Sequence, residues 1–422
     1  MNEYDSELVA GLLEKQDYTR AESSEDAQLI LLNTCSVREH AEEKVHARLG
    51  NLKVLKDKDP DVKLGVLGCM AQNLKEDLLT SKPYVDVILG PDSYRKLPSM
   101  LEDQTQSELN VIDTKLSRME VYDDLFPARR EGINAWISIM RGCDKFCTFC
   151  IVPFTRGRER SRSVESIVEE AQQVVEDGFK EITLLGQNVN SYTHEGRRFH
   201  ELLEGVAGID GLQRIRYTSP HPQDFDDELI AIHANNSKIC NHIHFPLQAG
   251  SNEVLERMNR TYSREHFVNM AQKMRDEIPG LSISTDMIVG FPGETEADFQ
   301  ETLEVMEEVR FDTAFTFKYS SRPGTKAAEF EDTVPEEEKQ NRLQQMITLQ
   351  REHTLYRNQL HVGDTMEILV EKDSKKSDMQ HQGRTRSNKI VIFDKAGEKP
   401  GDLVNVKVLD AKGITLFGRI VN

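Results

Sequence analysis

The chain of 422 residues has few cysteines, a single tryptophan and no long apolar run. Six Cys are too few for the disulfide framework of a secreted protein. No apolar run approaches the roughly 20 residues that a membrane helix needs, and the first residues lack the basic and apolar regions of a secretory signal. We therefore expect a cytoplasmic protein with no membrane partner.

An excess of positive charge is also missing. The formal net charge of −19 argues against a protein that coats nucleic acid generally, although a local basic site remains compatible with it. A hydrophobic content of 38% is enough to form sizeable cores, and the length predicts two to four domains. No pattern indicates oligomerisation, so we expect a monomer.

The first part of the chain alternates helical and strand-like patterns. Leu8, Leu12 and Leu13 have a helical spacing, and short apolar runs at 29–32, 62–67 and 85–89 are typical of buried strands. This alternation predicts an α/β domain over 1–105 with a flavodoxin-like parallel sheet. The pattern opens on a helix, so the first strand of such a domain is missing.

A polar linker is expected over 106–128, followed by a second α/β series over 129–357. Six strand candidates with helical patterns between them predict a partial or full β/α barrel: 136–140, 181–185, 214–218, 243–245, 282–289 and 314–318. Residues 360–422 instead show short alternating runs separated by turns, which predict a small β-barrel. Residues 358–422 hold 11 Lys and Arg against 9 Asp and Glu, a sign that suits a nucleic-acid-facing module.

Three cysteines form the clearest chemical motif. Cys143, Cys147 and Cys150 have the spacing C-x3-C-x2-C in a loop after the first barrel strand, where barrel sites form. Three thiolates can ligate three irons of a [4Fe–4S] cluster and leave the fourth iron open to a substrate. Phe149 would supply an apolar wall. The alternatives are a zinc site awaiting a fourth ligand, or buried thiols.

This loop, followed by a β/α barrel, resembles the radical S-adenosylmethionine (SAM) enzymes. Other motifs resemble the methylthiotransferases among them, and the last barrel, with Gly383-Arg-Thr385 and Asn388, resembles a TRAM domain, an RNA-binding module. Residues 147–162 are most similar to the synthases of 2-methylthio-dimethylallyladenosine in tRNA. The motifs are Met1–Ser6, Asn33–Arg38, Gly68–Gln72, Leu185–Asn190, His244–Ser251, Gly290–Glu294 and Tyr319–Thr325.

The resemblance implies SAM-binding residues in addition to the catalytic cysteines. Gly186, Gln187 and Asn188 would meet the methionine part of SAM. Gln248 and Ser251 would reach its ribose or the substrate, and Ile288 would pack on its adenine. An ordinary turn and a plain core strand are the alternative interpretations of these positions.

Four arginines follow the cysteine loop, and spacing of two would place them on one face of an extended strand. We expect Arg156, Arg158, Arg160 and Arg162 to contact RNA phosphates, or one of them, such as Arg156, the SAM carboxylate. A solvated surface run is the alternative. Five cations of the last domain are further candidates for the tRNA backbone: Lys375, Lys376, Arg384, Arg386 and Lys389.

Methylthiotransferases also carry a second [4Fe–4S] cluster, held by three Cys of the N-terminal domain. Cys35 and Cys69 match two of them, and each follows a predicted strand. The third belongs to a Gly-Cys-Gln-Met-Asn motif, and the chain begins at the Met of that motif. We expect a start assigned too late; a truncated enzyme is the alternative.

The resemblance implies a tRNA-modifying enzyme that uses two SAM and two clusters. It would add a methylthio group to carbon 2 of dimethylallyladenosine at position 37, in the anticodon stem-loop, with electrons from a flavodoxin or ferredoxin and sulfur from an unidentified source. The alternatives are methylthiolation of threonylcarbamoyladenosine, methylthiolation of a ribosomal-protein aspartate, and a non-catalytic RNA-binding paralogue.

Overall fold

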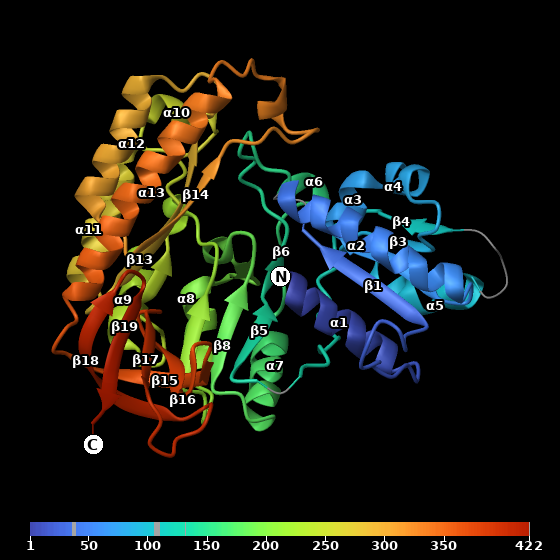
Figure 1. Cartoon of the computed structure of the whole chain (residues 1–422), viewed down its shortest axis with the longest axis horizontal. Helices are drawn as coiled ribbons and strands as arrows, with labels where there is room; N and C mark the ends of the chain where they lie inside the picture. Colours follow the sequence, from blue (N-terminus) through green and yellow to red (C-terminus); the bar gives the residue numbers. More distant parts are fainter. Residues whose placement is uncertain (36–38, 105–109, 131, 422) are drawn as a thin grey trace.

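A computed structural model describes the backbone of residues 1–35, 39–104, 110–130 and 132–421. Figure 1 shows an N-terminal α/β domain, a central barrel and a small C-terminal barrel below it. Residues 36–38 of the Asn33–Arg38 motif and residues 106–109 of the expected linker lie outside the described residues. No helix in the described part of the chain is long and apolar enough to cross a membrane.

The N-terminal domain is built on a four-stranded parallel sheet with the order β1-β2-β3-β4. Its strands are apolar because helices cover both faces, and Val66 and Ile88 are fully buried. The strands are β1 Leu29–Thr34, β2 Lys63–Gly68, β3 Val87–Leu89 and β4 Val111–Asp113. The helices are α1 Asn2–Glu14, α2 Glu39–Lys58, α3 Cys69–Leu74, α4 Glu76–Ser81 and α5 Leu97–Gln104.

Part of the segment expected to be a linker belongs to this domain. Residues 111–113 form β4, and Tyr122 and Leu125 are buried in the core between α1 and the central barrel. A three-residue strand is too short for its periodicity to be visible in the sequence.

The central barrel consists of two three-stranded parallel sheets, in the orders β11-β8-β5 and β12-β13-β14. β5 and β14 are the outer strands and do not pair with each other, so the barrel is open at this seam. The strands are β5 Asn134–Ser138, β8 Glu181–Leu185, β11 Arg214–Tyr217, β12 His242–His244, β13 Ser282–Val289 and β14 Thr313–Lys318. All six were predicted from the sequence.

Helices follow the barrel strands, and side chains of Ser163, Asp226, Ser263 and Thr295 cap the amino ends of α7, α9, α11 and α12. The central domain also contains two short antiparallel strand pairs. They are β6 Met140–Arg141 with β7 Arg160–Ser161, and β9 Thr193–His194 with β10 Arg197–Arg198. The helices are α6 Val152–Arg156, α7 Val164–Glu176, α8 Phe199–Ala207, α9 Asp227–Asn235, α10 Asn252–Arg257, α11 Arg264–Glu277, α12 Glu296–Val309 and α13 Glu336–Gln359.

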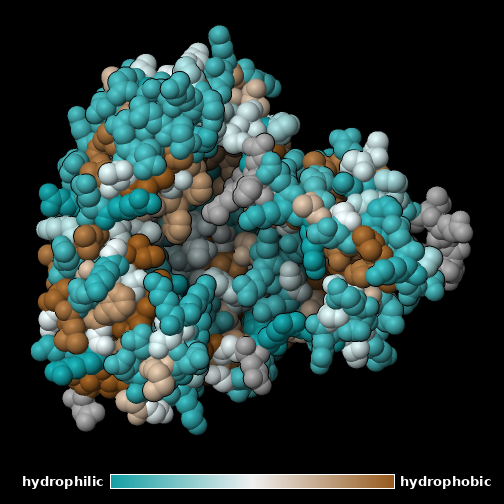
Figure 2. All heavy atoms as spheres, viewed as in Figure 1, coloured by the Kyte–Doolittle hydropathy of each residue, from teal (hydrophilic) through white to brown (hydrophobic). Residues whose placement is uncertain are grey.

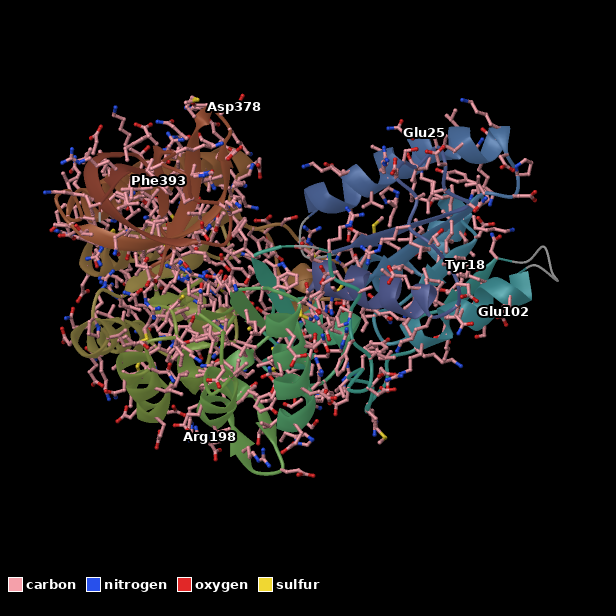
Figure 3. All side chains as sticks on the ribbon, turned by 90° about the horizontal axis from the view of Figure 1, so that it is seen from below. Tyr18, Glu25, Glu102, Arg198, Asp378 and Phe393 are labelled. Atoms are coloured by element: carbon pink, nitrogen blue, oxygen red, sulfur yellow. The ribbon has the colours of Figure 1, made fainter. Side chains whose placement is uncertain are left out.

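The C-terminal domain is a closed five-stranded barrel with the order β15-β16-β17-β19-β18. Alternate residues such as Val370 and Val406 fill its interior, as the alternating pattern predicted. Phe393 is buried inside this barrel. Figures 1 and 3 show the C-terminal domain on a different side of the central barrel from the N-terminal domain. The strands are β15 Thr365–Ser374, β16 Ser377–Thr385, β17 Ile390–Asp394, β18 Leu403–Lys412 and β19 Thr415–Ile420.

This C-terminal barrel is attached to the amino ends of the central strands. Arg214, fully buried, donates hydrogen bonds to the carbonyl oxygens of Arg384 (2.8 Å) and Glu367 (3.2 Å). Lys389 is buried and lies 2.7 Å from Asp312, while Arg386 donates to the carbonyl of Ile239. Lys389 and Arg386 are therefore interface residues here, not part of an exposed RNA-gripping surface.

We expect Arg214→Ala to destabilise this attachment. The substitution leaves two partly buried carbonyl groups and the Glu367 carboxylate, which lies 2.9 Å from Arg214, without their donor. This loss should lower the free energy of unfolding by about 3 kcal/mol. Chemical denaturation measures the loss, and Arg419→Ala, an exposed site on β19, is the control expected to stay within about 0.5 kcal/mol. Equal stabilities of the two variants would contradict the role of Arg214.

Candidate active site

The three-cysteine loop lies at the carboxyl end of β5, between β6 and α6. Cys143, Cys147 and Cys150 are free thiols and all three are partly exposed. Gly142 begins the loop with φ +82°, and a Cβ there would lie 2.0 Å from the carbonyl oxygen of Arg158. Only glycine fits this close turn, which explains why a Gly stands directly before the first Cys of the loop.

One thiol of the loop, that of Cys147, lies beside a cation. Arg260 Nη1 lies 3.3 Å from Cys147 Sγ, and its Nε donates to the Tyr262 hydroxyl at 2.9 Å. Burial raises the pKa of Cys143 and of Cys150 to about 12. In the metal-free protein these two thiols are protonated at neutral pH, so binding of a metal must release protons.

The number of thiols on the loop matches the needs of a cluster. Among the described residues, no group of three His, Cys, Asp or Glu is placed to hold one metal ion. In a [4Fe–4S] cluster each thiolate ligates a different iron, so three separated thiols on one loop meet the requirement.

Aromatic rings and backbone bonds hold the loop beside the barrel. Phe149 contacts Phe291 edge to face at 6.5 Å between ring centroids, and Phe291 in turn contacts Tyr319 at 5.2 Å. The Thr148 hydroxyl donates to the carbonyl of Arg257 at 2.8 Å. The predicted apolar wall at Phe149 is therefore part of a larger aromatic cluster.

The structure places Gly186, Gln187 and Asn188 against the cysteine loop. Gln187 Oε1 accepts a hydrogen bond from the amide of Gly142 at 2.6 Å, and a Cβ on Gly186 would lie 2.7 Å from Met140 Cγ. Asn188 donates to Asp224 at 2.9 Å. Gln187 Nε2 and Asn188 Oδ1 are buried without a hydrogen-bond partner, as groups that await a polar ligand would be.

Gln248 and Ile288 are also brought together at the carboxyl ends of their strands. The Gln248 amide donates to the carbonyl of Asp286, and its own carbonyl accepts from the Ile288 amide, both at 2.8 Å. Ser251 is instead buried and donates to Asp298. Its hydroxyl already has a partner within the protein.

Cys35 and Cys69 meet at one edge of the N-terminal sheet. They follow Thr34 and Gly68, which are register partners in β1 and β2, so the two cysteines converge as predicted. Cys69 is buried, and the Nε of Arg156 lies 3.2 Å from its sulfur.

The two cysteine sites are linked through Asp5 of α1. This fully buried carboxylate forms ion pairs with Arg141 at 2.5 Å and with Arg156 at 2.7 Å. Arg141 precedes the cysteine loop in the sequence, and Arg156 follows it. Burial alone would raise the pKa of Asp5, but the two guanidinium groups outweigh it and hold the pKa below its usual value.

The arginine run after the loop is largely an interface between domains. Arg160 pairs with Asp92 at 2.9 Å and Arg162 pairs with Glu170, all buried. Arg156 is occupied by Asp5 and Cys69, and Arg158 alone of the four is mostly exposed, paired with Asp144. Three of the four therefore do not face RNA in this structure, because they lie on α6, β7 and the following turn and meet carboxylates of other segments.

Sequence reasoning missed Asp5, Arg141 and Arg260. Asp5 lies in the opening motif and Arg141 two residues before Cys143, but neither position revealed a partner so distant along the chain. Arg260 had no local signal.

Comparisons with known proteins agree with this geometry. Residues 137–306 match the model of the radical SAM superfamily, residues 1–90 that of the uncharacterized protein family UPF0004, and residues 359–421 the TRAM domain. The fold resembles the radical S-adenosylmethionine methyltransferase TsrM of Kitasatospora setae, with TM-score 0.57, 15% identity and coverage of 78% of this chain and 74% of that one. Fold and site define a radical SAM enzyme.

Relatives that match over the full chain show which family of radical SAM enzymes this chain belongs to. The tRNA-2-methylthio-N(6)-dimethylallyladenosine synthase of Carboxydothermus hydrogenoformans is 46% identical over 100% of this chain and 97% of its own length. The enzyme of the same name from Porphyromonas gingivalis is 48% identical over 100% and 93%. The chain belongs to this family, and it is a radical SAM methylthiotransferase.

We expect Asp5→Ala to be strongly destabilising. The change leaves Arg141 and Arg156 buried without their carboxylate, which should cost about 3–5 kcal/mol of unfolding free energy. Chemical denaturation of the metal-free protein measures it, with the exposed Glu3→Ala on the same helix as control. A loss of stability no larger than that of the control would show that the ion pairs of Asp5 with Arg141 and Arg156 do not stabilise the fold.

The Asp5 ion pair also predicts a pH dependence. Because the folded-state pKa lies below the ordinary value, its stabilisation is fully present above about pH 4 and is lost as pH falls through the folded pKa. The stability difference between wild type and Asp5→Asn should be constant from about pH 7 to pH 5 and shrink only below about pH 4. A difference that shrinks near neutral pH would contradict this assignment.

Proposed function

We propose that this enzyme adds a methylthio group to carbon 2 of N6-dimethylallyladenosine in tRNA, at position 37 of the anticodon loop. The observation that carries the proposal is the set of three free thiols on one clamped loop at the open end of a β/α barrel. The names of relatives that are 44–48% identical support the tRNA substrate.

Cys143, Cys147 and Cys150 would hold a [4Fe–4S] cluster with one open iron. When bound there together with SAM, the cluster supplies an electron that cleaves the sulfonium homolytically and so permits attack on an unactivated C–H bond. Arg260 would keep its contact with the sulfur of Cys147, and the aromatic cluster at Phe149 would form an apolar wall beside the loop. The backbone around Gly186 and the amides of Gln187 and Asn188 would receive the polar end of SAM, while Ile288 would pack on its adenine.

A second cluster would be held at Cys35 and Cys69, together with the third cysteine that the family supplies from its Gly-Cys-Gln-Met-Asn motif. This site, at the carboxyl edge of the N-terminal sheet, is next to Arg156. Arg156 also pairs with Asp5, the carboxylate that holds Arg141 beside the first cysteine loop. Methyl transfer to sulfur on this second cluster, using a second SAM, would prepare the group that is delivered. The reductant would be a flavodoxin or ferredoxin, and the enzyme would act in the cytoplasm.

The two cysteine sites can be tested separately. Anaerobically reconstituted wild type should hold roughly eight irons per chain, and both Cys143→Ala and Cys35→Ala/Cys69→Ala should hold roughly four. Cys143→Ala should lose production of 5′-deoxyadenosine from SAM, whereas the Cys35 and Cys69 variant should keep it and lose only the methylthiolated nucleoside.

The readouts are iron content, the Mössbauer spectrum, and mass spectrometry of nucleosides from tRNA incubated with the enzyme. Cys240→Ala is the control, since Cys240 is buried and outside both sites. Deoxyadenosine without methylthiolated dimethylallyladenosine, but with methylthiolated threonylcarbamoyladenosine, would overturn the substrate assignment. Zinc in place of iron would overturn the whole proposal.

A further inference from the structure

Two carboxylates, those of Asp224 and Glu159, join the cysteine loop to the loop that follows β8. Asp224 ends the short 3-10 helix Pro222–Asp224 after β11, and Glu159 lies between α6 and β7. The proposed function gives neither carboxylate a role. Figure 1 shows α6, directly after the cysteine loop, beside the N-terminal domain. The molecular surface is hollowed between that domain and the central barrel (Figure 2).

The Asp224 carboxylate uses one oxygen for each loop. Its Oδ1 accepts a hydrogen bond from Lys145 Nζ at 2.7 Å, and its Oδ2 accepts one from Asn188 Nδ2 at 2.9 Å. Lys145 lies between Cys143 and Cys147 in the sequence. One side chain therefore fixes the cysteine loop relative to the loop that would bind the polar end of SAM.

Glu159 forms a second bridge between the same two loops. Its Oε1 accepts from the backbone amide of Asp144 at 3.2 Å, and its Oε2 accepts from the Ser191 hydroxyl at 2.9 Å. The same Oε1 lies 3.4 Å from Asn188 Nδ2. Both carboxylates thus face one amide nitrogen, and the contact with Asp224 is the shorter and stronger of the two.

These contacts determine the orientation of the Asn188 amide. An ionised carboxylate accepts hydrogen bonds and cannot donate one, so only the NH2 group of Asn188 can face Asp224 and Glu159. The carbonyl oxygen Oδ1 is therefore turned away from them, and it is buried without a partner in a side chain that is 1% exposed. A buried acceptor without a partner is a place for a donor of a ligand.

The neighbouring Gln187 is fixed in the opposite sense. The Gly142 amide donates to its Oε1 at 2.6 Å, so its Nε2 is the group that remains buried without a partner. Asn188 and Gln187 together offer one acceptor and one donor. These match the ammonium and the carboxylate at the amino-acid end of SAM.

The turn that carries Asp224 is attached to the same loop. The Asn190 side chain donates to the carbonyl of His221 at 2.9 Å and accepts from the His221 amide at 2.7 Å. The Asp224 amide donates to that same carbonyl at 3.0 Å. The distance between Asp224 and Asn188 is therefore set by hydrogen bonds on both sides of the contact.

We propose that Asp224 is a positioning residue for SAM. It acts through Asn188, whose carbonyl oxygen it holds toward the ammonium group of SAM, and it anchors the cysteine loop through Lys145 at the same time. Glu159 supports the same orientation of the amide. This inference rests on the proposed function and adds the residues that set the direction of its hydrogen bonds.

Asp224→Asn tests the inference with almost no change in side-chain volume. The ammonium of Lys145 can only donate, so it takes the single oxygen of the new side chain. The new NH2 group then faces Asn188, whose amide turns its oxygen toward that group and away from SAM. We expect the Kd for SAM to rise by about tenfold or more.

Anaerobic equilibrium dialysis of the reconstituted full-length protein, without reductant, would measure the Kd for two ligands. One is SAM, and the other is 5′-deoxy-5′-dimethylsulfonioadenosine, in which a methyl group replaces the amino-acid chain. This analogue keeps the adenosine and the positive charge of SAM. A lost charge or a damaged fold would weaken binding of both ligands, whereas a turned Asn188 amide weakens binding of SAM alone.

Two further variants complete the design. Asp227→Asn removes an exposed carboxylate three residues along the chain and is expected to bind both ligands like the wild type. Lys145→Met/Asp224→Asn should recover most of the affinity for SAM. Without the ammonium, the new side chain is free to turn its oxygen toward Asn188 and restore the orientation of that amide.

The inference would be overturned by unchanged SAM binding in Asp224→Asn, by equal weakening of both ligands, by loss of iron from this variant, or by a double variant that does not recover. In each of these cases the proposed function stands if the wild type binds SAM and releases 5′-deoxyadenosine on reduction. If the wild type binds no SAM, the proposed function fails and this inference fails with it.

Discussion

The arrangement of the enzyme depends on one buried carboxylate, that of Asp5, held between Arg141 and Arg156. Three charges without contact with water are tolerated only when their geometry is complete. Completion requires that α1 of the N-terminal domain docks on the central barrel and that the cysteine loop has its final shape. Docking of the domains and shaping of the loop are therefore one event, and Arg156 extends it to the sulfur of Cys69.

The opposite end of the barrel uses arginine in a similar way. Arg214 points from the amino end of β11 into the C-terminal domain, where it is satisfied by backbone carbonyls rather than by solvent. The C-terminal domain thus covers the amino end of the barrel, and the barrel is open along the seam between β5 and β14.

Much of this could be predicted from the sequence because the barrel strands are short runs in which apolar residues are continuous or alternate with polar ones, between segments with a helical period. All six were located, and so were the cysteine loop and the convergence of Cys35 with Cys69. The strand at 111–113 was too short to be recognised. The arginine run was interpreted as an RNA contact because a sequence shows charge but not its partner. The arginines are neutralised by carboxylates of other segments. Asp5 and Asp92 lie in the N-terminal domain, and Glu170 lies on the following helix, α7.

The C-terminal barrel forms the floor of the central one, and this has a consequence for synthesis. The ribosome makes the chain from its amino end, so all six central strands emerge before β15. Until the last 58 or so residues are made, the lumen of a nascent barrel is open at its base and Arg214 lacks its acceptors. A messenger that ends early, even beyond the complete cysteine loop and every barrel strand, would yield a polypeptide whose polar interior is open to solvent and to proteases.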